Sequence, residues 1–147
     1  MVLYLEDLSP GMRFTSTTHA LDGAQVREFA AAFDPQPFHL DDEGAAGTIF
    51  GTMAASGWHV AAISMKLLIG AVPVAGGIVG GGGELAWPSP TRPDDILHVV
   101  SEIVEVIPSR SKPDRGMGIL RSETRNQNGD VRQVFTAKLV LRRRPAG

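Results

Sequence analysis

The apolar positions in the first third of the chain follow a helical period. Between positions 26 and 33 they recur at i, i+3, i+4 and i+7, which predicts an amphipathic helix with one buried stripe: Val26, Phe29, Ala30 and Phe33. Asp22 stands at the N-cap position, and Gln25 stands where a capping box places its second partner. Prolines at positions 35 and 37 remove two backbone donors, so the helix ends near Asp34. Residues 34–39 are therefore expected to form a stiff, extended loop.

A second and longer helix is predicted at residues 57–69. Its apolar residues cover almost the whole circumference: Trp58, Val60, Ala61, Ala62, Ile63, Met65, Leu67, Leu68 and Ile69. A helix that is apolar all round must be enclosed by protein or by lipid. Lys66 and the nearby Pro73 make a membrane span costly. We therefore expect the rest of the chain to enclose this helix.

The remaining apolar segments have the composition and alternation of strands. Strands are predicted at residues 12–19, 78–87, 96–107, 117–127 and 131–142, with a helical turn at 41–46 and a connection at 47–56. Asn128-Gly129 is a strong signal for a tight hairpin between the last two strands. This order predicts an α+β fold, a single domain over residues 1–147 in which an antiparallel sheet wraps around the central helix. Long edge strands favour a symmetric dimer that pairs them.

Composition and charge narrow the function classes. The chain has 147 residues, of which 43% are hydrophobic and 20% charged, as in ordinary globular domains. The absence of cysteine excludes disulfides, thiolate nucleophiles and cysteine-ligated metals. A net charge of −2 argues against nucleic acid as a partner, and a start without a basic, apolar leader makes the cytoplasm the default location.

The charges are unevenly distributed along the chain. Residues 1–60 carry 2 basic and 8 acidic side chains, which leaves 12 basic and 8 acidic side chains for residues 61–147. Two solvated faces would explain this difference, and so would a basic half that helps to hold an anionic ligand. The sequence leaves both explanations open.

The most distinctive chemistry lies in the proline-containing loop. Asp34 and His39 bracket it, and the two prolines limit the freedom of both side chains. A carboxylate and an imidazole directed at one water molecule form an acid–base pair that works near neutral pH. The alternative is that Asp34 caps a turn and His39 is a buried polar residue. Gly57, at the start of the second helix, is a candidate backbone donor to an oxyanion, or simply allows close packing.

Together these motifs resemble a known family. Asp34-x-x-Pro37-x-His39, followed by Phe50-Gly51 and then by Gly57 at the start of an apolar helix, is similar to the MaoC-like dehydratases, which include the (R)-specific enoyl-CoA hydratases. The resemblance implies a hot-dog fold, a homodimer or higher homo-oligomer with active sites at the subunit interface, and reversible addition of water to a trans-2-enoyl-CoA.

The resemblance also implies roles for individual residues. Asp34 and His39 would activate the water that attacks C3 and handle the proton at C2, and Gly57 would donate its N–H to the thioester oxygen. Side chains expected to bind the substrate are Phe38, Ser56, Trp58, Arg110 and Lys112, the last two at the phosphates of coenzyme A. Coenzyme A is part of the substrate, and neither a separate cofactor nor a metal ion is expected. Acyl-CoA is thus the expected partner, without nucleic acid or membrane.

Two departures from the family pattern concern the loop. The family commonly has asparagine where this chain has Gln36, and often histidine where it has Ser56. Neither change removes an acid or a base, but both leave open how the loop is braced. The segment 142–144, with three arginines, reads as a solvated strand end or as a second candidate for the coenzyme A phosphates.

Rival functions remain at this point. Hot-dog thioesterases and acyl-carrier-protein dehydratases commonly place a carboxylate on the central helix, where this chain has none. A dimeric acyl-CoA binding module without turnover would keep the same pocket. A metal site at His39, Asp41 and Asp42 lacks a second well-placed histidine. Of the other histidines, His59 is expected to be a packed or pocket-lining residue, and His19 and His98 are expected to be structural.

Overall fold

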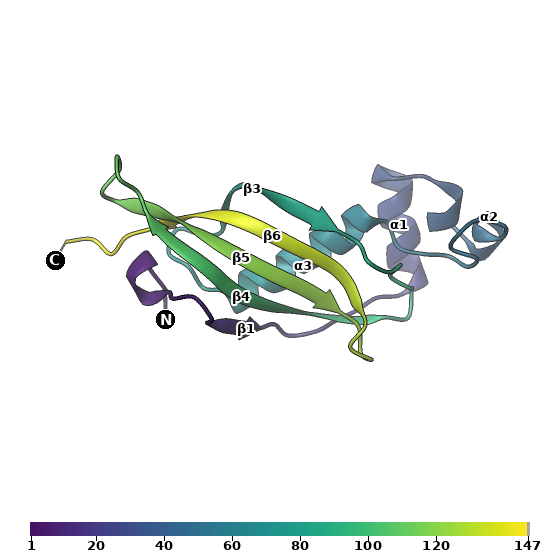
Figure 1. The fold of residues 1–147 in the computed structure, drawn as a ribbon. Coiled ribbons are helices and arrows are strands. Elements are labelled where there is room, and N and C mark those ends of the chain that lie inside the picture. The colour runs from purple at the N-terminus through teal and green to yellow at the C-terminus, as the bar shows by residue number, and fades with distance from the viewer. Residues whose placement is uncertain (147) are drawn as a thin grey trace.

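An antiparallel sheet lies against one long helix (Figure 1). The computed structural model describes residues 1–146. The strands are β1 (Arg13–Thr15), β2 (His19–Ala20), β3 (Val79–Ala86), β4 (Ile96–Pro108), β5 (Arg115–Arg125) and β6 (Val131–Arg142). They pair in the order β1-β4-β5-β6-β3, and β2 also pairs with β4. The α+β fold with a sheet around a central helix is confirmed.

The central helix is α3 (Gly57–Ala71), and its enclosure is only partial. One side packs on the sheet and on α1 (Gly23–Phe33), which buries Val60, Ile63, Leu67 and Leu68. The opposite side leaves Trp58 60% and Ile69 58% exposed. The sheet curls around α3 but does not enclose it on all sides, so the expectation of complete enclosure is wrong. One sheet and one short helix leave part of the surface of α3 uncovered. Within residues 1–146, no helix is long and apolar enough to cross a membrane.

The N-terminal end of α1 differs from the predicted capping box. Asp22 accepts a hydrogen bond from the backbone N–H of Gln25, as an N-cap residue should. The Gln25 side chain instead donates to the carbonyl of Ala20 and bonds to the ring of His19. Only one half of the capping box forms, because β2 offers Gln25 a better partner.

Two predicted strands differ from expectation: one is divided, and the other is shifted by two residues. The segment 12–19 forms two strands, β1 and β2, because the hydroxyl of Ser16 accepts the N–H of Val99 and interrupts the backbone ladder. The strand predicted to reach position 127 ends at Arg125. There the side chain of Asn126 accepts the N–H groups of Asn128 and Asp130 and forms the turn itself.

The glycine run at positions 80–83 lies in β3, at one edge of the sheet. The pairing of β3 with β6 shifts register between Gly80 and Gly82, which marks a β-bulge that bends the edge. A Cβ at Gly83 would lie 2.5 Å from the carbonyl oxygen of Thr136, so the close approach there is to β6 and not to the central helix. Figure 1 shows α1 and α2 (Asp42–Ala45) at one end of the sheet, with the β4–β5 hairpin at the other end.

Candidate active site

The proline-containing segment connects α1 to a single 3-10 turn. Asp34 is the C-cap of α1, with its N–H donated to the carbonyl of Ala30. The proline after it prevents the helix from continuing. Pro37 then begins the turn η2 (Pro37–His39), which ends with the ring of His39 buried. The backbone thus carries both candidate side chains to the amino end of α3.

The structure brings Asp34 and His39 together. Nε2 of His39 lies 3.2 Å from Oδ2 of Asp34, and His39 is only 5% exposed. On the other side of the ring, Nδ1 lies 2.7 Å from the carbonyl oxygen of Ala54. A carbonyl can only accept, so Nδ1 carries the proton and donates it. In the neutral imidazole Nε2 is then a free acceptor beside the carboxylate.

Asp34 is braced by two further side chains. Ser56 donates its hydroxyl to Oδ2 at 2.7 Å, and Gln36 donates its amide to Oδ1 at 2.6 Å. Burial alone would raise the pKa of Asp34. The hydrogen bonds from Ser56 and Gln36, with a smaller contribution from the neighbouring His39, outweigh burial and hold the pKa below its ordinary value. The carboxyl group is therefore ionised throughout the neutral range. The departures from the family pattern, Gln36 and Ser56, are the braces of this loop.

Replacement of Ser56 by alanine is expected to raise the pKa of Asp34, because the anion loses a donor while burial remains. The measurement is the carboxyl 13C chemical shift of Asp34 followed through a pH titration. Ser64→Ala is the matched control, since Ser64 is also a buried serine but lies within α3 and bonds to Thr124. An unchanged Asp34 pKa in Ser56→Ala would contradict this account of the bracing.

A cavity of about 560 Å³ opens beside the pair. Most of its wall is apolar, and its lining includes Asp34, Gln36, Phe38, His39, Ile49, Phe50, Gly57, Trp58 and Trp87. Trp58 and Trp87 meet edge to face, with ring centroids 5.4 Å apart. The carboxylate and the imidazole thus face an apolar space in which a small organic substrate fits.

Gly57 lies at the point where the cavity meets the helix. A Cβ at this position would lie 2.5 Å from Cε2 of Trp87, whose ring is held by a hydrogen bond to Gln133. Ser56, the N-cap of α3, accepts the N–H of Trp58. The first N–H groups of a helix have no partner within the helix, and the helix dipole adds positive charge there. The Gly57 N–H is therefore suited to an anionic oxygen in the cavity.

Several predicted site residues lie elsewhere. Phe38 and Trp58 line the cavity, but Ser56 is fully buried and its hydroxyl points to Asp34 instead of to a substrate. Arg110 and Lys112 lie in the β4–β5 hairpin, at the opposite end of the sheet (Figure 1). Within one chain they cannot reach a ligand in this cavity by direct contact.

The two carboxylates of the alternative metal site are engaged in structural hydrogen bonds. Asp41 accepts the N–H of Gly44, and Asp42 accepts the N–H of Met53, so both carboxylates shape the loop. His59 is buried and stacks on Phe29 with a centroid distance of 4.5 Å. Burial, and secondarily the charge of His19, lowers the pKa of His59, as fits a packed neutral ring.

Sequence reasoning did not single out the residues that fix the cavity walls. Arg92 donates to the carbonyls of Thr52 and Phe50 and so holds the loop that carries Phe50. Arg132 pairs with the buried Asp95 at 2.9 Å and holds the segment after Trp87. These partners are 37 or more positions apart in the chain, and no local pattern links them.

The fold and the site together define a protein class. A curled antiparallel sheet around one apolar helix, with polar groups gathered at the amino end of that helix, is a hot-dog fold. The family model described as a MaoC like domain matches residues 8–122. The chain therefore belongs to the MaoC-like dehydratase family, and its activity at the level of the family is that of a hydro-lyase.

Individual relatives support this assignment. A MaoC-like dehydratase from Rhodospirillum rubrum is 52% identical, with a TM-score of 0.96 over 98% of this chain and 99% of that chain. The 3-hydroxybutyryl-CoA dehydratase of Methylorubrum extorquens is 33% identical over 112 residues, which cover 76% of this chain and 70% of the relative. The R-hydratase PhaJ1 from Pseudomonas aeruginosa is 25% identical, with a TM-score of 0.72 over 98% of this chain and 92% of that chain.

Proposed function

We propose that this protein adds water reversibly to the double bond of a trans-2-enoyl-CoA, with Asp34 and His39 as its acid–base pair. The observation that carries the proposal is the 3.2 Å approach of His39 Nε2 to Asp34 Oδ2 beside an apolar cavity. The relatives named as a 3-hydroxybutyryl-CoA dehydratase and an R-hydratase support the substrate class. Coenzyme A arrives as part of the substrate, and no other cofactor takes part.

The geometry suggests how the pair holds the reacting water. With Nδ1 of His39 donating to Ala54, Nε2 is an acceptor, and so is the carboxylate of Asp34. A water on the cavity side of both groups donates one hydrogen to each and keeps a lone pair free for C3. As the C3–O bond forms, one O–H bond of the water breaks, and its proton passes to the Asp34–His39 pair. The π electrons of the double bond move toward C2 and the thioester oxygen.

Gly57 would stabilise the charge that develops on the thioester oxygen. Gly57 lines the cavity at the positive end of α3, and its backbone N–H matches a donor that acts on the enolate. The proton taken from water then returns to C2, which completes the addition with no net gain or loss of protons by the protein. Dehydration is the same path in reverse.

The acyl chain would extend into a second space. A cavity of about 300 Å³ between α3 and the sheet shares Trp58 with the first and is lined almost entirely by apolar groups, including Met65, Leu68 and Phe135. This cavity supports an acyl chain as the group that enters beyond the reacting carbons.

The proposal includes a homodimer in which residues 1–147 of each chain form one hot-dog domain. All residues of β3 except Leu85 are exposed, and β3 pairs only with β6 among the described residues. Such an edge favours pairing with another strand, and a two-fold dimer joins two copies of β3 antiparallel.

The experiment follows the absorbance of an enoyl-CoA at its thioester conjugation band together with a thiol reagent. Loss of the conjugated signal without thiol release is the expected result. Release of thiol would instead indicate a thioesterase. Binding of the thioester without either change would indicate an acyl-CoA binding module. Both of these results contradict the proposal.

A further inference from the structure

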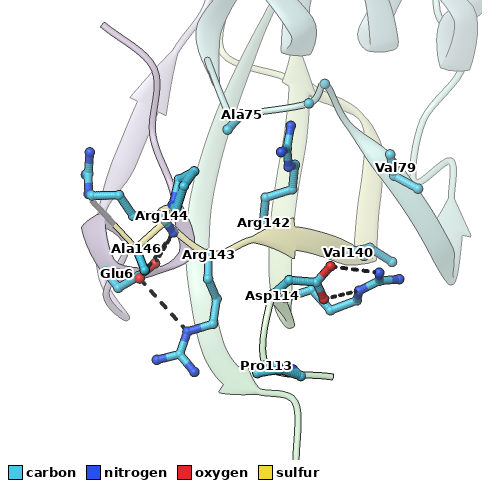
Figure 2. Close-up of a pocket in the computed structure, with 14 residues that line it drawn as sticks. Glu6, Ala75, Val79, Pro113, Asp114, Val140, Arg142, Arg143, Arg144 and Ala146 are labelled. Carbon is cyan, nitrogen blue, oxygen red and sulfur yellow. Dashed lines mark hydrogen bonds and ion pairs between the residues drawn. The ribbon is translucent and has the colours of Figure 1, made fainter. Parts of the chain in front are cut away.

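A second cavity, of about 820 Å³, lies at the end of the sheet opposite to Asp34 and His39. It is formed where the turn after α3 meets the end of β6, and three arginines are among its lining residues: Arg142, Arg143 and Arg144 (Figure 2). The catalytic chemistry proposed above makes no use of this cavity within one chain. Its positive charge suits a polyanionic ligand.

Arg142 is the arginine that remains available. Arg143 lies 3.9 Å from Glu6, Arg144 pairs with Asp7, and Arg115, on the same rim, pairs with Asp114. For Arg142, by contrast, no ion pair forms within residues 1–146, and Figure 2 shows its side chain extending toward the turn near Ala75.

The turn beside Arg142 is shaped to hold its side chain. Gly76 has a φ of +80°, and a Cβ there would lie 2.8 Å from Cδ of Arg142. The absence of a side chain at Gly76 thus makes room for the arginine stem. The guanidinium is left exposed at the rim, without a protein carboxylate, and such a group is well suited to a phosphate.

The edge strand β3 connects the two ends of the molecule. Val79 begins β3 and pairs with Val140, two residues before Arg142. Ala86 ends β3 and precedes Trp87 in the wall of the Asp34–His39 cavity. The strand has 8 residues and so spans about 26 Å, at roughly 3.3 Å per residue. Each chain therefore holds its free arginine far from its own catalytic pair.

A two-fold dimer through β3 removes this separation. Antiparallel pairing about the middle of the strand places the start of one β3 beside the end of the other. Arg142 of the partner subunit then lies level with Pro88, which also lines the cavity. The lateral distance is two strand spacings, or about 10 Å. The pantetheine arm of coenzyme A can cover this distance.

We propose that Arg142 of each subunit binds the phosphates of the coenzyme A thioester whose acyl group reacts in the other subunit. The inference rests on the proposed function and adds the residue that recognises the nucleotide end. Arg110 and Lys112 lie in the β4–β5 hairpin at the same end of the sheet, so their predicted contact with coenzyme A would also be made across the dimer.

The first test compares two substrates in the Arg142→Ala variant. KM for an enoyl-CoA is expected to rise about tenfold with kcat little changed, as for the loss of one charge-assisted hydrogen bond. KM for the matching N-acetylcysteamine thioester, which lacks the nucleotide, should not change. Arg13→Ala is the control, because Arg13 is an exposed arginine on β1, at the other edge of the sheet. An unchanged KM for the enoyl-CoA, or equal changes for both thioesters, overturns the proposal.

The second test asks which subunit supplies the arginine. Heterodimers are purified through two different tags, and kcat/KM is measured at low substrate. A dimer of one Asp34→Asn chain and one Arg142→Ala chain keeps one complete site, so about half of the wild-type value is expected. A wild-type chain paired with a chain carrying both changes should retain only about one twentieth.

The reverse order of these two heterodimers would place Arg142 in the site of its own chain and overturn the proposal, as would a monomeric protein at assay concentrations. Failure of the proposed function is distinguishable, because the wild-type protein would then not hydrate enoyl-CoA at all. In that case the affinity of Arg142→Ala for coenzyme A, measured by calorimetry, still tests the inference, and unchanged affinity contradicts it.

Discussion

Replacement of Asp34 by asparagine is expected to lower kcat for enoyl-CoA hydration at least about a hundredfold, and His39→Ala by a similar factor. Asparagine keeps the shape of the side chain but cannot accept a proton from water. His39→Ala removes the second acceptor, Nε2, which lies 3.2 Å from the carboxylate. Initial rates at saturating substrate measure both effects.

The fold should survive both changes. Asp34 and His39 lie at the end of α1 and in the turn after it, and neither belongs to the two clusters of buried apolar residues. Glu28→Gln is a matched control, because Glu28 is an exposed carboxylate on α1 and should leave the rate unchanged. Near-normal turnover in Asp34→Asn or in His39→Ala would remove the pair from the mechanism.

The second large effect is expected at Gly57. A methyl group there meets the indole of Trp87 at 2.5 Å, so either the ring or the start of α3 must move. A displacement of about 1 Å at a catalytic donor can cost on the order of a hundredfold in rate, and we expect kcat/KM of Gly57→Ala to fall by that factor. Overpacking of this kind also lowers the free energy of unfolding by about 1–3 kcal/mol.

A second glycine in the same helix provides the control. Gly70 lies in α3 with no atom within 4 Å of an added Cβ, so Gly70→Ala should retain activity and gain up to about 1 kcal/mol of stability from helix propensity. Removal of the indole in the double variant Gly57→Ala, Trp87→Ala should restore part of the stability lost in Gly57→Ala. Full activity in Gly57→Ala would exclude the proposed role of this N–H.

The fold was largely predictable because its signals are local. The helical period from Val26 to Phe33 predicted α1, and the alternation in the last strands predicted the sheet. The buried stripe was predicted to include Phe33, which is instead 75% exposed at the end of the helix. The extent of β5 was not predictable. The side chain of Asn126 accepts backbone N–H groups and so ends the strand. The alternation of apolar and polar residues does not predict such side-chain hydrogen bonds. The partial exposure of α3 was also not predicted. Apolar composition indicates that a helix surface should be buried, but not whether its own chain or a second molecule buries it.

The candidate site was predictable only where its residues are close in the chain. Asp34 and His39 stand out through the prolines between them. Ser56 is 22 positions from Asp34, and its role as a hydrogen-bond donor depends on the way that α3 docks. The sequence named the segment 142–144 as a candidate for the coenzyme A phosphates, but the proposed role of Arg142 at the partner's site emerges only when the two ends of β3 are compared. Spacing can suggest which groups are reactive, but bracing and subunit contributions follow from tertiary packing.

The most direct test of the central claim is a double-mutant cycle on kcat/KM for enoyl-CoA hydration. Two groups that hold one water act as a unit, so the variant with both Asp34→Asn and His39→Ala should be about as slow as the slower single variant. Losses that multiply in the double variant would show that the two residues act independently, and would contradict a shared water between them.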